Sequence, residues 1–232
     1  MNFNVQVMFE TIFVVFGAVP RTFLVAFIIL IIGVGLGGVL AFIKIKKIPV
    51  LTQLINIFIS YARGVPLIVH LLVVRAALPD GVSALLNMLG YGIEPHELPN
   101  IMIVLVTYIF LEAALQSENL RGAFLSVDTK QIEAGLSIGF THRQNLKRVI
   151  IPQALAVALP LILNGFLKII KALSLAFVVG AVDILAQARY AAALNYRYLE
   201  SYVAAALVYW LICGVLLLIF NKIEKQMQVG RA

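Results

Sequence analysis

Charged side chains are scarce in this sequence. Only 12% of its 232 residues are Asp, Glu, Lys or Arg, whereas 62% are hydrophobic. In soluble domains about a quarter of the residues are charged, so this deficit indicates a protein whose solvent is a lipid bilayer. A chain of this length has room for one domain with a handful of membrane spans.

Cysteine and histidine are rare as well. The single cysteine, Cys213, excludes an internal disulfide, and its apolar surroundings in the sequence predict a small core residue. Three scattered histidines offer no metal-ligand spacing. A phosphate-binding loop, a nucleophile elbow and a catalytic carboxylate pair are also missing. We therefore expect no metal, no cofactor and no enzymatic reaction in this chain.

Long apolar runs dominate the sequence instead. They are continuous rather than alternating, which favours helices over a β-barrel. The sequence predicts an all-α integral membrane protein with a single transmembrane domain over residues 1–232. Five spans are expected, at residues 23–43, 51–78, 100–116, 154–182 and 201–220.

The basic residues predict an orientation, because cytoplasmic loops are enriched in Lys and Arg. Most of the eighteen gather in three places, which are the end of the first span, the segment 118–152 and the C-terminus. These residues are Lys44, Lys46, Lys47, Arg121, Lys130, Arg143, Lys147, Arg148, Lys222, Lys225 and Arg231. The N-terminus is therefore expected outside and the C-terminus inside. Because the cations do not cluster with aromatic residues, no nucleic-acid partner is expected.

Proline and glycine mark interruptions of the second span. Pro66 removes a backbone donor and disfavours helix at Val65, which predicts a break after Arg63-Gly64. Pro79-Asp80-Gly81 predicts a turn at the end of this span.

Two other spans carry similar signals. In the fourth, Pro160 and Gly165 predict further breaks. In the first, Gly33-x-x-x-Gly37 has the spacing of a close helix contact.

Charged residues at membrane depth are costly, so they are candidates for function. Lys168 and Lys171 share a helix face with Ser174 and could attract a carboxylate. Alternatively, both lysines extend to the interface or pair locally.

The second span carries its own candidates. Arg63 and His70 are seven residues apart and are expected on one face, beside the helix break. A hydrogen-bonded core histidine is the alternative for His70. Arg75 is either a substrate ligand or an arginine at the outer interface near Asp80.

The polar segment 118–152 contains two helix-start signals. Asp128-x-x-Gln131 and Thr141-x-x-Gln144 both match a capping box, in which side chain and backbone bond reciprocally. Gly139 separates them. The sequence predicts a pair of short helices joined by a glycine turn, which is typical of a docking surface.

Glu133-Ala134-Gly135, with Gly139 and Ile151-Pro152 downstream, resembles the motif of a permease subunit of an ATP-binding-cassette importer. Gly135 stands in place of the second alanine of that family's Glu-Ala-Ala motif. The similarity to the polar amino acid uptake branch extends through most of the chain. It includes Arg63-Gly64-Val65-Pro66, Glu118-x-x-Arg121-Gly122, Pro152-Gln153-Ala154, Leu159-Pro160, Asn164 and Lys171-x-x-Ser174-Leu175.

The resemblance implies a multi-pass permease in the bacterial cytoplasmic membrane. Two permease subunits, identical or paralogous, would form the path, and an external solute-binding protein would deliver an amino acid. A cytoplasmic ATPase dimer, holding ATP and Mg, would dock on the helix pair. The residues implied in that coupling are Glu133, Ala134, Gly135, Gly139 and Arg143, and Asn164 joins the candidates for the path.

Departures from the branch bear on the substrate. Ala172 and Gly165 stand where relatives carry acidic residues, so an acidic pocket for a cationic amino acid is not expected. The run from Ser174 to Gly180, with Asn195-Tyr196-Arg197-Tyr198, looks most like permeases for cystine and related sulfur amino acids.

Two other classes remain open. An ion- or proton-coupled secondary transporter should carry acidic residues deep in its spans or an internal repeat. The expected positions of Glu112 and Asp183 near span ends speak against it. A membrane scaffold without transport would need neither broken helices nor paired lysines.

Overall fold

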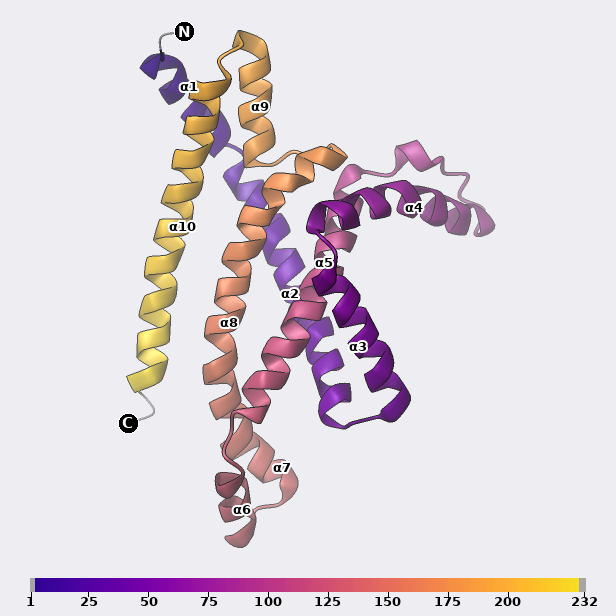
Figure 1. Ribbon diagram of the computed structural model, residues 1–232, viewed down its shortest axis with the longest axis vertical. Coiled ribbons are helices and arrows are strands. Elements are labelled where there is room, and N and C mark those ends of the chain that lie inside the picture. The colour runs from indigo at the N-terminus through magenta and orange to yellow at the C-terminus, as the bar shows by residue number, and fades with distance from the viewer. Residues whose placement is uncertain (1–2, 230–232) are drawn as a thin grey trace.

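The computed structural model describes residues 3–229, and within that range all regular structure is helical (Figure 1). Arg231, one of the cations expected inside, lies outside these residues. In chain order the elements are α1 Val5–Phe16, α2 Val19–Ile45, α3 Pro49–Gly64, α4 Leu67–Met88, η1 Pro95–Glu97, α5 Asn100–Leu125, α6 Thr129–Ser137, α7 His142–Asn145, η2 Leu146–Ile150, α8 Ile151–Ala172, η3 Leu173–Val179, α9 Ile184–Asn195 and α10 Tyr198–Val229.

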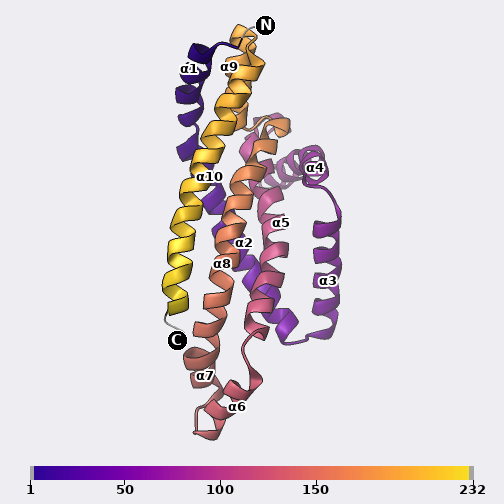
Figure 2. The same cartoon turned by 60° about the vertical axis from the view of Figure 1, so that its left-hand side comes forward.

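The long helices form a bundle of membrane-spanning dimensions. Figures 1 and 2 show α2, α5, α8 and α10 running along the long axis, with the two ends of the chain at opposite ends of the molecule. Among the described residues, five helices are long and apolar enough to cross a membrane. These are Val19–Ile45, Leu67–Met88, Asn100–Leu125, His142–Val179 and Tyr198–Gln226. The prediction of an all-α membrane protein is confirmed.

Two glycines of α2 bring its backbone against α5. A Cβ atom at Gly37 would lie 2.8 Å from the Cβ of Gln116 and 2.9 Å from the backbone nitrogen of Ser117. At Gly33 it would lie 2.6 Å from Cγ of Glu112. Only glycine permits this approach, so the contact predicted from the Gly33-x-x-x-Gly37 spacing is confirmed.

Two apolar clusters hold the helices together. The larger joins α2, α4, α5, α8 and η3 around fully buried side chains such as Ile29, Leu71 and Ile170. The second packs α1 against α9 and α10 through Val15, Ala188 and other apolar residues. By contrast, large apolar residues cover the outer face, as expected for contact with lipid; they include Phe13, Trp210 and Leu218.

The second expected span is two helices in the structure. Val65 and Pro66 are extended, with ψ of 135° and 142°, so the break predicted at Pro66 is confirmed. Figure 1 shows α3 running along the bundle and α4 running across it. The predicted span 51–78 therefore covers parts of two helices that run in different directions.

The turn expected at Pro79-Asp80-Gly81 is wrong, because α4 continues through Pro79 to Met88. Gly90 and Gly92 make the turn instead, with φ of 89° and 62°, values that favour glycine. The Asn87 side chain holds the residues that follow this turn, because the Oδ1 atom of Asn87 accepts a hydrogen bond of 2.7 Å from the Ile93 nitrogen.

The breaks expected at Pro160 and Gly165 are also wrong. Both lie inside the continuous helix α8, where strong helix formers flank Pro160 and membrane helices tolerate the missing donor. The regular helix ends instead at Ala172, whose carbonyl accepts a bond of 2.5 Å from the Tyr108 hydroxyl. This tertiary contact lies where the α-helical turns give way to the tighter turns of η3, and the helix itself continues to Val179.

The third span is longer than expected. α5 continues past Gln116 to Leu125, and Glu118 on this extension forms ion pairs with Lys44 at the end of α2 and with Arg121. The extension moves Glu112 to the middle of α5 rather than near its inner end, which corrects its predicted position.

The outer loop expected at 183–200 contains helix α9. Asp183 caps this helix, accepting a bond of 2.9 Å from the Ala186 nitrogen and one of 3.0 Å from the Tyr209 hydroxyl. Burial raises the pKa of the Asp183 carboxyl, although these hydrogen bonds act in the opposite direction.

The glycine contact between α2 and α5 makes a direct test possible. Gly37→Ala should destabilise the protein by about 1–3 kcal/mol, because the methyl group meets backbone atoms of α5 that cannot move aside. Gly35→Ala is the matched control, since a Cβ there meets nothing within 4 Å and adds only helix propensity. Thermal unfolding of the purified protein in detergent should show a lower Tm for the first variant alone. Equal Tm values would contradict the close contact.

Candidate functional site

The helix pair α6 and α7 projects beyond the bundle at the end where α10 finishes (Figures 1 and 2). Thr141 and Gln144 form the predicted capping box at α7. At α6 the prediction holds only for Asp128, which accepts a bond of 2.9 Å from the Lys130 nitrogen. Gln131 does not complete the second box; its Oε1 accepts a bond of 2.5 Å from Gln153 on α8, which ties the pair to the bundle.

Gly135 and Asn145 hold the two short helices together. Asn145 is buried, and its Nδ2 donates a bond of 2.7 Å to the Ile132 carbonyl on α6. A Cβ atom at Gly135 would lie 2.6 Å from Oδ1 of Asn145. The glycine in place of the family's second alanine therefore makes room for Asn145. Sequence reasoning missed Asn145, which matches no motif.

The rest of the pair presents an exposed surface. Glu133 and Ala134 on α6 and Arg143 on α7 are exposed, and Ile138 is 73% exposed despite being apolar. Gly139 follows with φ of 88°, the left-handed conformation expected of a glycine turn. An apolar and charged tip of this kind suits docking to another protein.

A single long helix connects this tip to the membrane-spanning part. His142–Val179 is continuous over 38 residues. It includes α7, the wide π turn of η2, α8 and the tighter turns of η3. Such π turns occur frequently at functional sites. Displacement of α7 would therefore act directly on α8.

The exposed side of α8 carries the polar residues predicted for a path. Asn164, Lys168 and Lys171 are all exposed and are spaced four and three residues apart, so they form one polar face. Ser174 continues from it, with its hydroxyl donating a bond of 2.8 Å to the Lys171 carbonyl. The structure thus brings these four candidates together.

Arg63 and His70 do not share a face, contrary to the prediction, because the break at Pro66 puts them on different helices. Arg63 is exposed at the end of α3. His70 is buried among aromatic rings, 5.0 Å from the ring centroid of Tyr61, and its Nδ1 lies 3.2 Å from the Pro66 carbonyl. This geometry favours the alternative of a core histidine.

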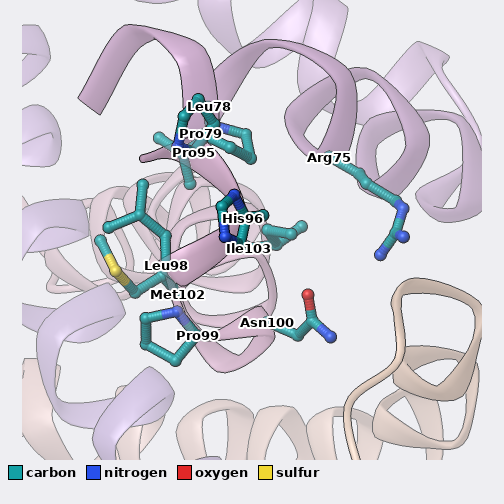
Figure 3. A pocket seen from close by; sticks show the side chains of 10 residues that line it. All are labelled: Arg75, Leu78, Pro79, Pro95, His96, Leu98, Pro99, Asn100, Met102 and Ile103. Carbon is teal, nitrogen blue, oxygen red and sulfur yellow. The ribbon is translucent and has the colours of Figure 1, made fainter. Parts of the chain in front are cut away.

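Arg75 has a role that neither alternative anticipated. Its Nη1 donates a bond of 2.8 Å to the Val179 carbonyl at the end of η3, and no ion pair with Asp80 occurs among residues 3–229. It also borders a pocket of about 260 Å³ with His96 and Asn100 (Figure 3). Arg75 therefore ties α4 to the end of the long helix.

A buried polar cluster on α5 was also missed. Glu112 is only 5% exposed, and its Oε1 accepts a bond of 2.6 Å from Nε2 of Gln116. Asn119 donates a further bond of 3.3 Å to Gln116. The signal was available, because Glu112 and Gln116 are four residues apart within an apolar span, the spacing of side chains on one helix face.

Comparison with known proteins shows which family carries features of this kind. The model of the family "binding-protein-dependent transport system inner membrane component" matches residues 33–229. The chain is 35% identical over 210 residues to PatM of Vibrio harveyi, described as a probable amino-acid ABC transporter permease protein, covering 90% of each chain. It is 32% identical to the L-cystine transport system permease protein TcyL of Bacillus subtilis, covering 90% of this chain and 85% of TcyL. The crystal structure of an amino acid ABC transporter with histidines superimposes with a TM-score of 0.83 at 25% identity, over 97% of this chain and 100% of that one.

The Gly135–Asn145 contact predicts a non-additive pair of substitutions. Gly135→Ala gains helix propensity of about 1 kcal/mol but pushes against Asn145. In the Asn145→Ala background the push is gone. A double-mutant cycle should therefore show that Gly135→Ala changes the free energy of unfolding more favourably in the Asn145→Ala chain than in the original chain, by at least about 1 kcal/mol. Additive effects would contradict the contact.

Proposed function

The chain belongs to the family of binding-protein-dependent transport system inner membrane components, and from this premise we propose how it works. It is an amino-acid permease subunit of an ATP-binding-cassette importer, a multi-pass protein of the bacterial cytoplasmic membrane. The secondary transporter and the scaffold find no support among its relatives. We propose that residues 1–232 act as one permease domain, with the N-terminus outside and the C-terminus inside.

The continuous helix His142–Val179 carries this proposal. Its first turns belong to the exposed tip, and its later turns carry the polar face of α8. Closure of a partner ATPase dimer around the tip would move this helix as a lever and switch the path between inward and outward access. ATP and Mg belong to that partner, and this chain performs no hydrolysis.

At the tip, Glu133, Ala134 and Arg143 would contact the ATPase, because all three are exposed. Gly135 and Gly139 would act indirectly. The first admits Asn145 and the second turns the chain between α6 and α7. The basic residues at this end of the bundle favour its placement in the cytoplasm.

A second permease subunit, identical or paralogous, would cover the polar face of α8 and complete the path. Three polar side chains exposed on a membrane-spanning helix are costly against lipid, so we place them on a water-filled path. Lys171 is the proposed partner of the substrate carboxylate, with Asn164, Lys168 and Ser174 beside it. Arg63, exposed at the end of α3, is a further candidate, whereas His70 and Arg75 would hold α4 in place.

The proposed substrate is a polar amino acid that an external solute-binding protein delivers. The similarity to TcyL favours cystine or another sulfur amino acid as the narrower candidate. The polar face of α8 shows no acidic side chain among the described residues, which suits a substrate without a cationic side chain.

Reversal of charge at Glu133 tests the docking. In the complex with its ATPase, Glu133→Arg should abolish stimulation of ATP hydrolysis by the loaded binding protein, because it places a cation at the docking surface. Glu10→Arg makes the same charge change on the exposed side of α1, at the other end of the molecule, and should leave co-purification of the ATPase unchanged. Retained co-purification and stimulation in Glu133→Arg would refute the docking role.

Substitution of Lys171 tests the path. Lys171→Gln should raise the KM for uptake at least about tenfold, since a hydrogen bond to a charged group contributes roughly 1.5–3 kcal/mol. Lys222→Gln removes the same charge from an exposed position near the end of α10 and should leave the KM unchanged. Uptake assays in membrane vesicles with labelled cystine and other amino acids would measure both. An unchanged KM in Lys171→Gln would remove it as a carboxylate ligand.

A further inference from the structure

A carboxylate from α5 reaches the backbone of α8 through a gap that glycine leaves. A Cβ atom at Gly165 would lie 3.0 Å from Oε1 of Glu112 and 2.7 Å from Nε2 of Gln116. On the other side, a Cβ at Gly33 of α2 would lie 2.6 Å from Cγ of Glu112. The Glu112 side chain is therefore clamped between three helices.

Lys168 is a cation of α8 three residues after Gly165, on the adjoining part of the same helix surface. Lys168 itself is exposed on the polar face of α8, whereas Glu112 is buried. A carboxylate buried inside a membrane protein is costly unless an opposite charge lies nearby, and Lys168, one turn beyond Gly165, is placed to supply that charge.

We propose that Glu112 is a positioning residue for Lys168, compensating its charge from behind α8. The polar face then carries one net positive charge, that of Lys171, rather than two. Such a face suits a substrate with a single uncompensated carboxylate, as in a zwitterionic amino acid, and disfavours a second carboxylate. This inference rests on the proposed role of the α8 face as the path.

The local potential at the face can be measured without transport. Cys213 is the single cysteine, so Cys213→Ala provides a cysteine-free chain for the reporter Asn164→Cys. In the complete complex in proteoliposomes, the reporter would be treated with an anionic and a cationic methanethiosulfonate reagent. The ratio of the two labelling rates reports the charge near residue 164.

Glu112→Gln keeps the shape and a hydrogen-bonding group but removes the negative charge. The anionic-to-cationic rate ratio should rise by at least roughly threefold, because one unit charge at about 10 Å changes this ratio by roughly fourfold even at the dielectric constant of water, about 80. Lys168→Gln should lower the ratio by a similar factor. The double variant should return it to the starting value. A purely structural effect would change both rates in parallel and leave the ratio unmoved.

An unchanged ratio in Glu112→Gln, or a double variant that stays as far from the starting value as Glu112→Gln alone, would overturn the pairing. Should Glu112→Gln fail to assemble, Lys168→Gln still decides, because an unmoved ratio there would exclude Lys168 as a charge on this face. The absence of labelling of Asn164→Cys by both reagents would overturn the placement of the face on water. By contrast, the expected ratios combined with an unchanged KM in Lys171→Gln would leave the charge pair standing and refute the proposed path.

Discussion

Close packing of α2 on α5 is the constraint on which the rest of the structure depends. Within a bilayer, apolar side chains gain little by leaving lipid for another helix, so association depends on close fit and on polar contacts. Gly33 and Gly37 supply the fit, since a side chain at either position would collide with α5. This contact in turn encloses Glu112 and Gln116, which could not remain buried against lipid. The arrangement of α8 follows, because Gly165 packs onto the same two side chains.

The long helix from His142 to Val179 is held at defined points rather than along its whole length. Asn145 binds it to α6, and the Tyr108 hydroxyl binds the Ala172 carbonyl where α8 ends. Arg75 binds the Val179 carbonyl where η3 ends. Each contact satisfies a backbone carbonyl, including those that helix ends leave free. On the proposed docking at the tip, these are the points through which movement of the helix would reach α4 and α5.

The sequence predicted what depends on local chemistry. Pro66 breaks the helix because its effect on Val65 is local, and Gly33-x-x-x-Gly37 marks a contact because glycine spacing is visible in the sequence. Prediction from the sequence failed where contacts between residues far apart in the chain determine the structure. Pro160 carries the same signal as Pro66, yet α8 continues through it and ends where Tyr108 meets Ala172. Likewise, the ion pair of Glu118 with Lys44 lies on the extension of α5 that places Glu112 at its middle, and the two partners are far apart in sequence.

At the tip and at the proposed path alike, a glycine of one helix leaves room for a polar side chain of a neighbouring helix. Gly135 admits the amide of Asn145 from the neighbouring helix, and Gly165 admits the carboxylate of Glu112. In both places a polar group occupies space that alanine would fill, so the two helices interlock. The Asn145 amide also bonds across to the Ile132 carbonyl of α6, whereas the Glu112 carboxylate is held by Gln116 on its own helix. An apolar contact would tolerate sliding, whereas an interlocked polar group favours discrete positions. A helix that joins one such contact to the other is suited to pass a two-state movement from the proposed docking surface at the tip to the charge on α8.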